Sequence, residues 1–193
     1  MHSIADVLAG LLLSALLLPV LMYTALYLDF WLVSSPLSAP VTLFLSFLAI
    51  WIYPSSGRWT PARGETTAIL GSYIGAQMGF WLLVQLGYLT TGGMKEAFVW
   101  DRWNLAHIVI RSVIGGIVGG IAKTGSKPVW IRFSCYLAGI DHRRYENSRN
   151  LFVELFYKFW SYATLGMMVV SVSPLIFSIL GIQRESFLSE LTP

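Results

Sequence analysis

The first candidates for chemistry are a histidine and an aspartate at the start of the chain. His2 and Asp6 stand four positions apart in the segment MHSIAD, and residues at i and i+4 lie on one face of a helix. The Asp6 carboxylate could then accept a hydrogen bond from one imidazole nitrogen and leave the other as a nucleophile or base. This spacing also arises by chance, and a terminal histidine is most often simply solvated. Spacing alone is therefore a weak indication of catalysis.

Other catalytic arrangements are not indicated. Ser3 adjoins His2, and neighbouring helical positions cannot form a Ser-His-Asp triad. No cluster of His, Cys, Asp and Glu has the spacing of metal ligands, so we expect no metal site and no cofactor. The single cysteine, Cys135, permits no internal disulfide.

One charged residue lies inside an apolar run. Arg111 lies six residues after Leu105, where the fourth run begins, and four after His107, so Arg111 and His107 share a helix face. A charge at the centre of a span costs about 2.5 to 3.5 kcal/mol on insertion scales, so it is informative. Arg111 could bind an anionic group of a substrate, pair with Glu65 or Asp6, or extend to the interface from near the end of the span. Extension to the interface is the ordinary interpretation, and substrate binding is the functional hypothesis.

Composition predicts that membrane helices position these residues. The 193 residues are 55% hydrophobic and only 12% charged, about half the charged fraction of soluble domains. Five apolar runs approach the ~20 residues that a helix needs to cross a bilayer. They are roughly Ile4 to Phe30, Leu37 to Tyr53, Thr66 to Leu89, Leu105 to Ala122 and Tyr157 to Ile182. We predict an all-α, polytopic integral membrane bundle of about five transmembrane helices, with residues 1–193 as a single membrane domain.

Charged residues between the runs carry topological information. The stretch from Lys123 to Lys158 mixes basic and aromatic side chains at helical spacing, which favours an amphipathic helix at the interface. The alternative is a solvated loop. With five spans, Met1, Arg58, Arg63 and this stretch fall on one side, which the positive-inside rule makes cytoplasmic. The net charge of +3 comes from such clusters, and we expect no nucleic-acid partner.

Two glycine series lie within the spans. The first is Gly71, Gly75 and Gly79, and the second is Gly115, Gly116, Gly119 and Gly120. Glycines four residues apart let helix backbones approach closely in lipid, so we predict that both series are packing faces. The alternative is close approach of the backbone to a lipid head group or acyl chain.

Longer segments resemble a known family. MHSIADVLAGLLLSALLL resembles the third motif of the type 2 phosphatidic acid phosphatases (PAP2), S-R-x5-H-x3-D, starting one residue before its histidine. Three further segments resemble the C-terminal half of the sphingosine-1-phosphate phosphatases, the sphingolipid branch of that superfamily. They are WTPARGETTAILGSYIGAQMGFWL, RSVIGGIVGGIAKTGSKPV and VELFYKFWSYATLGMMVVSVSPLIFSILGI. The segments follow the order of the family and cover nearly the whole chain.

The resemblance implies roles and surroundings. His2 aligns with the nucleophile that takes the phosphoryl group as phosphohistidine, and Asp6 aligns with the carboxylate that orients it. It also implies a lipid phosphate substrate such as sphingosine 1-phosphate, membrane lipids as partners, and no metal or other cofactor. The implied location is the endoplasmic reticulum membrane, with the site facing the lumen. This orientation conflicts with the Lys and Arg count, and we give it priority because the number of spans is the weaker input.

The chain departs from the family at two elements. The K-x6-R-P motif, which clamps the phosphate, and the P-S-G-H motif, which protonates the leaving group, are absent from the sequence. Losing an oxyanion donor costs about 10² to 10³ in rate, and losing a general acid about 10² to 10⁴. We therefore expect a fragment or short isoform of a lipid phosphate phosphatase that is inactive alone. The alternatives are a non-catalytic lipid-binding or regulatory relative, and an unrelated transporter or channel subunit, which no inverted repeat supports.

Overall fold

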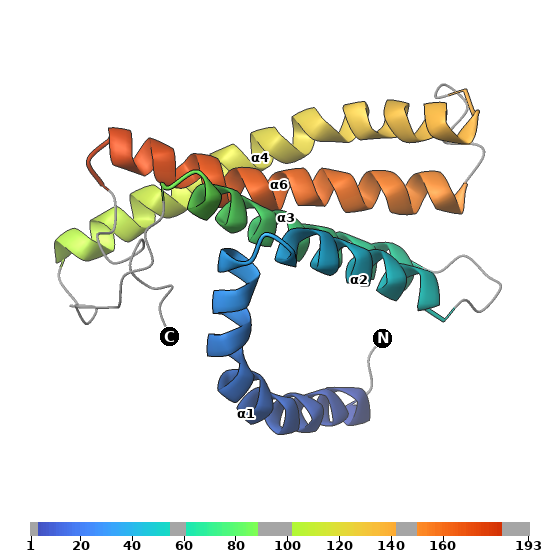
Figure 1. Ribbon diagram of the computed structural model, residues 1–193, viewed down its shortest axis with the longest axis horizontal. Helices are drawn as coiled ribbons and strands as arrows, with labels where there is room; N and C mark the ends of the chain where they lie inside the picture. Colours follow the sequence, from blue (N-terminus) through green and yellow to red (C-terminus); the bar gives the residue numbers. More distant parts are fainter. Residues whose placement is uncertain (1–3, 55–60, 89–101, 142–149, 183–193) are drawn as a thin grey trace.

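The computed structural model describes residues 4–54, 61–88, 102–141 and 150–182, and these residues form five helices (Figure 1). The helices are α1 (Ile4–Ser34), α2 (Ser38–Ile52), α3 (Pro61–Gln85), α4 (Arg102–Ala138) and α6 (Leu151–Ile179). Within α1, α3, α4 and α6 lie four stretches that are long and apolar enough to cross a membrane: Ile4–Thr24, Ala62–Gln85, Leu105–Ala138 and Leu151–Ile179. The prediction of an all-helical, multi-pass membrane protein is confirmed.

The second predicted span is shorter than expected. Leu37 to Tyr53 forms α2, a helix of 15 residues. At 1.5 Å per residue it is about 22 Å long, against about 30 Å for the hydrocarbon core. α2 nevertheless runs antiparallel to α3 along most of its length. The carbonyl of Ser35, just before α2, accepts a hydrogen bond from Trp81 near the end of α3. The carbonyl of Ile50, near the end of α2, accepts one from Arg63 near the start of α3.

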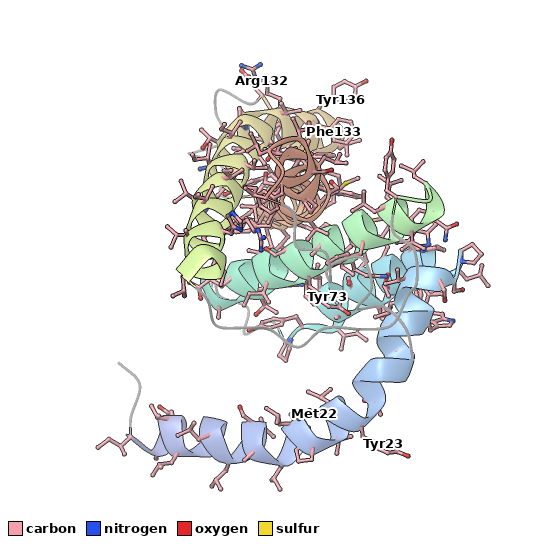
Figure 2. All side chains as sticks on the ribbon, turned by 90° about the vertical axis from the view of Figure 1, so that its left-hand side faces the viewer. Met22, Tyr23, Tyr73, Arg132, Phe133 and Tyr136 are labelled. Atoms are coloured by element: carbon pink, nitrogen blue, oxygen red, sulfur yellow. The ribbon has the colours of Figure 1, made fainter. Side chains whose placement is uncertain are left out.

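The first half of α1 turns away from the other helices (Figure 1). Every residue from 4 to 23 is exposed. Pro19 lies inside the helix, and Met22 and Tyr23 lie where α1 bends (Figure 2). Proline lacks the N–H for the helical hydrogen bond and clashes with the preceding turn, which accounts for the bend. An apolar helix exposed on all sides needs lipid or another apolar surface around it.

The first glycine series brings α3 and α6 into backbone contact. The helices run parallel, and their facing residues are Gly71 with Phe159, Gly75 with Ala163 and Gly79 with Met167. A Cβ atom at Gly75 would overlap the carbonyl group of Ala163. From the other side, a Cβ at Gly166 would overlap the backbone of Ser72. The predicted packing face is confirmed for this series.

The second glycine series behaves differently. A Cβ atom at Gly115, Gly116 or Gly120 would meet no atom within 4 Å, and one at Gly119 would meet only Val169 Cγ2, at 3.2 Å. The prediction of a packing face is therefore wrong for three of these glycines within the described part of the chain. They leave α4 with an open backbone surface on the outside of the bundle.

Aromatic side chains join α4 to α6 instead. The Trp130 ring stacks on Trp160 with centroids 5.2 Å apart, and Trp130 Nε1 donates a hydrogen bond to Thr164 Oγ1 at 3.0 Å. Gly119 faces Val169 and Arg111 contacts Ile182. α4 therefore runs antiparallel to α6.

The prediction of a separate interfacial helix between Lys123 and Lys158 is wrong. Residues 123–138 continue α4, and residues 151–158 begin α6. The rings of Trp130 and Phe133 contact aromatic rings of α6, whereas Arg132 and Tyr136 are exposed (Figure 2). Its charged residues from 142 to 149 lie outside the described residues. A helix of 37 residues is about 55 Å long, so α4 extends beyond the hydrocarbon layer.

These directions give the bundle a basic end. α3 and α6 begin there and α4 ends there, which brings Arg63, Arg132 and Lys158 to the same end. The opposite end holds the start of α4, with Arg111, and the end of α6.

The glycine contact makes a direct prediction about stability. We expect Gly75→Ala to lower the free energy of unfolding by about 1 to 3 kcal/mol, because the new methyl group would overlap a backbone carbonyl that cannot rotate away. Gly115→Ala is the matched control, since its methyl group meets open space. It should leave stability unchanged or raise it by up to about 1 kcal/mol through better helix propensity. Thermal unfolding in detergent, followed by loss of the monodisperse gel-filtration peak, measures both. Equal effects of the two substitutions would contradict the contact.

Candidate functional site

The predicted catalytic pair lies at the start of α1. Asp6 is exposed in the first turn of the helix, where the positive end of the helix dipole stabilises a carboxylate. His2 lies outside the described residues, so its hydrogen bond to Asp6 stays a prediction. The structure places Asp6 on a helix whose described part begins at Ile4.

Arg111 holds the end of α6. Its Nε atom donates a hydrogen bond of 2.6 Å to the carbonyl oxygen of Ile182, just after the last turn of that helix. The negative end of the helix dipole favours a cation there. Glu65 lies at the basic end, next to Gly64, which faces Lys158. The alternative that Arg111 pairs with Glu65 is therefore wrong. Binding of a lipid substrate by Arg111 stays a prediction.

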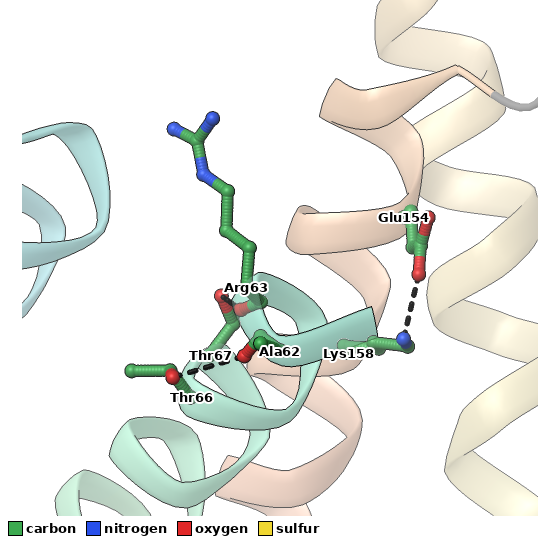
Figure 3. Close-up of polar contacts among 6 residues, drawn as sticks. All are labelled: Ala62, Arg63, Thr66, Thr67, Glu154 and Lys158. Atoms are coloured by element: carbon green, nitrogen blue, oxygen red, sulfur yellow. Dashed lines mark hydrogen bonds and ion pairs between the residues drawn. The ribbon is translucent and has the colours of Figure 1, made fainter. Parts of the chain in front are cut away.

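The basic end contains an ion pair that the sequence analysis did not identify. Lys158 Nζ lies 2.6 Å from Glu154 Oε1 within α6, and the side chains are 24% and 12% exposed (Figure 3). Gly64 of α3 packs against the pair, and a Cβ there would overlap the Lys158 ammonium group. The signal for the pair was the Glu-x-x-x-Lys spacing in VELFYK.

Arg63 directly precedes Gly64 in α3, and its side chain extends away from the ion pair (Figure 3). Its Nη2 atom donates a hydrogen bond of 3.1 Å to the carbonyl of Ile50 in the last turn of α2. Its Nε atom is buried and has no hydrogen-bond partner among the described residues. Within residues 4–54, 61–88, 102–141 and 150–182, the ion pair found is that of Lys158 with Glu154, and none involves this guanidinium. A buried, charged donor without a partner carries a free-energy cost.

A cavity of about 200 Å³ adjoins Arg63, between α2, α3 and α6. It is lined by Phe47, Ile50, Trp51, Arg63, Phe152, Leu155, Phe156 and Phe159. Arg63 is the one charged member of this set, and the others are aromatic or aliphatic. Sequence reasoning missed the cavity because its walls come from three helices, and α6 is far from α2 and α3 along the chain.

Sequence comparison identifies relatives of the chain. Human sphingosine-1-phosphate phosphatase 2 is 26% identical over 188 residues, which cover 94% of this chain and 47% of that protein. Rat sphingosine-1-phosphate phosphatase 1 is 29% identical over 188 residues, covering 94% of this chain and 44% of that protein. The mouse phosphatase 2 is 24% identical over 187 residues, covering 94% and 53%.

The chain is a distant homologue of the sphingosine-1-phosphate phosphatases. It spans about half the length of the curated relatives it matches. No family model matches the chain, and no solved structure matches it. The resemblance found in the sequence segments is thus confirmed as distant homology to these phosphatases.

The ion pair at the basic end can be tested by a double-mutant cycle. We expect Glu154→Gln and Lys158→Met each to lower the free energy of unfolding by about 1 to 3 kcal/mol, because each removes the opposite charge from a part-buried charged group. The double variant should lose less than the sum, with a coupling of about 0.5 to 3 kcal/mol. Arg132→Gln, an exposed change at the same end, should stay within about 0.5 kcal/mol of the parent. Unfolding in mixed detergent and dodecyl sulfate micelles provides the measurement, and strictly additive losses would refute the pair.

Proposed function

We propose that this chain carries the C-terminal part of a lipid phosphate phosphatase that acts on sphingosine 1-phosphate or a related long-chain base phosphate. The observation that supports the proposal is homology over 94% of this chain to proteins named sphingosine-1-phosphate phosphatases. Four stretches able to cross a membrane suit a substrate whose hydrocarbon chain lies in the bilayer. By the same resemblance, we propose the endoplasmic reticulum membrane as the location.

In the proposed reaction, His2 is the nucleophile. Its free imidazole nitrogen attacks the phosphorus atom, the bond from phosphorus to the lipid oxygen breaks, and the lipid leaves as an alcohol once its oxygen takes up a proton. Water then attacks the phosphohistidine, which releases inorganic phosphate and regenerates the imidazole. Asp6 accepts a hydrogen bond from the other ring nitrogen, so it fixes the tautomer and stabilises the positive charge on the phosphorylated ring.

Arg111 is our candidate for contact with the phosphate of the substrate. Two motifs that serve this reaction in the family are not found in the sequence given. One is the K-x6-R-P motif that clamps the phosphate oxygens, and the other is the P-S-G-H motif that protonates the leaving oxygen. We place both in the half of the relatives that this chain does not span. Phosphoryl transfer depends on such positioning and charge stabilisation, so the chain by itself should remain close to the background rate.

A chimera tests the proposal. Residues 2–193 would replace the matching segment of human sphingosine-1-phosphate phosphatase 2, and the product would be reconstituted in phosphatidylcholine vesicles with radiolabelled sphingosine 1-phosphate. We expect hydrolysis by the chimera, and none by the present chain beyond that of its His2→Ala variant. In the chimera, His2→Ala should reduce turnover to background, and Asp6→Asn should reduce it by about 10² to 10⁴ because the tautomer is no longer fixed.

The controls separate the chemistry from folding. Ser3→Ala alters one of the three residues between His2 and Asp6 without removing a proposed catalytic group, so its turnover should match the parent chimera. Rapid acid-free quenching should trap label on the chimera in an acid-labile, base-stable form that disappears with His2→Ala. Normal turnover by the His2→Ala chimera would exclude His2 as the nucleophile.

A further inference from the structure

The cavity at the basic end combines apolar walls with a cation that forms no ion pair with any residue that the structure describes. Arg63 lines it, with its Nε atom buried and unbonded. Arginine stays charged at every physiological pH, and its planar edge matches the oxygens of a phosphate or carboxylate. Buried donors are almost always satisfied in native proteins, so an unsatisfied one beside a cavity indicates a missing acceptor. The expected ligand therefore carries an anionic oxygen.

The rest of the cavity selects for hydrocarbon. Its other lining residues carry aromatic or aliphatic side chains, among them Phe156 and Leu155. At about 200 Å³, it is smaller than the roughly 300 to 1,000 Å³ of pockets that enclose a whole small molecule. The space therefore suits a segment of an alkyl chain whose remainder stays outside the bundle.

The position of the cavity matches the depth of lipid head groups. Arg63 is the third residue of α3, and Trp51 lies in the last turn of α2. Tryptophan and arginine at the ends of spans mark the interface, where lipid phosphates lie. Trp51 is 78% exposed and Phe152 is 52% exposed, so part of the lining faces outward, toward surrounding lipid.

From these observations we propose that the cavity binds one membrane lipid with an anionic phosphate head group. The phosphate pairs with the Arg63 guanidinium, and part of one alkyl chain enters the space between α2, α3 and α6. A lipid and free phosphate share this head-group chemistry, and the apolar walls favour the lipid.

This site needs no catalysis at His2, so it holds whether or not the proposed phosphatase function does. Its readout is binding, whereas the readout of the proposed function is turnover by the chimera.

Quenching of tryptophan fluorescence measures the binding. The full chain would be reconstituted in phosphatidylcholine vesicles that contain increasing fractions of phosphatidic acid with brominated acyl chains. Because bromine quenches at contact and Trp51 lines the cavity, we expect a saturable component at low mole fraction of the probe. Trp51→Phe should remove that component. Arg63→Gln should raise the half-saturating fraction at least tenfold.

Matched variants distinguish binding in the cavity from general electrostatic attraction between the basic end and anionic lipid. Arg132→Gln removes an exposed charge at the same end and should leave the binding curve unchanged. Leu155→Phe fills the cavity without changing charge and should weaken binding about as much as Arg63→Gln. If Arg63→Gln alters the gel-filtration profile, Arg63→Lys and Leu155→Phe carry the test, and Arg63→Lys should bind less tightly than the parent.

Two further measurements, one with a lipid that lacks phosphate and one with inorganic phosphate, identify the chemistry of the ligand. Brominated diacylglycerol has the same chains and no phosphate, and it should give no saturable component. Millimolar inorganic phosphate should not displace the brominated phosphatidic acid. Saturable quenching by diacylglycerol, displacement by inorganic phosphate, or an equal loss in Arg132→Gln would each overturn the proposed lipid site.

Discussion

The backbone contact between α3 and α6 sets the geometry of the bundle. Glycines at positions 71 and 75 bring the helix backbones to a distance that no other residue permits. In lipid, where apolar side chains gain little by leaving their surroundings, such close van der Waals packing is a principal source of helix association. The contact also fixes the register of the two helices. The first turns of both meet at the basic end, so Gly64 lies against the Glu154–Lys158 pair.

The sequence predicted the class of fold well, because bilayer thickness sets the length of an apolar run regardless of its partners. It did not predict which helices touch. Gly71 and Gly115 belong to series with the same spacing, yet one series packs tightly and most of the other meets nothing. Spacing shows that a close approach is sterically allowed, and only the arrangement in space supplies the partner. For the same reason, Trp130 suggested an interfacial helix from the sequence, while in the structure it stacks on Trp160.

The candidate sites also differ in whether their residues are close together in the sequence. The His2 and Asp6 motif is local, so it could be recognised from six residues, although His2 lies outside the described part of the chain. The cavity beside Arg63 is assembled from α2, α3 and α6, and no local pattern identifies it. Arg111 was conspicuous as a charge inside an apolar run, and the structure gives it a partner in the carbonyl group of Ile182. A costly charge within an apolar run is thus explained by the end of a neighbouring helix.

The end of the bundle near which the predicted nucleophile lies depends on the course of α1. Contacts fix the directions of α2, α3, α4 and α6, and they gather Arg63, Arg132 and Lys158 at one end. The last turn of α1 reaches the opposite end, where Gln85 Nε2 donates to the carbonyl of Ser34. Residues 4–23 are exposed, so packing within the chain does not hold them in place. If this half crosses the bilayer, Asp6 lies on the same side as the basic end. The conflict between the Lys and Arg count and the lumenal site implied by the family therefore concerns this one helix, and the packed bundle is compatible with either orientation.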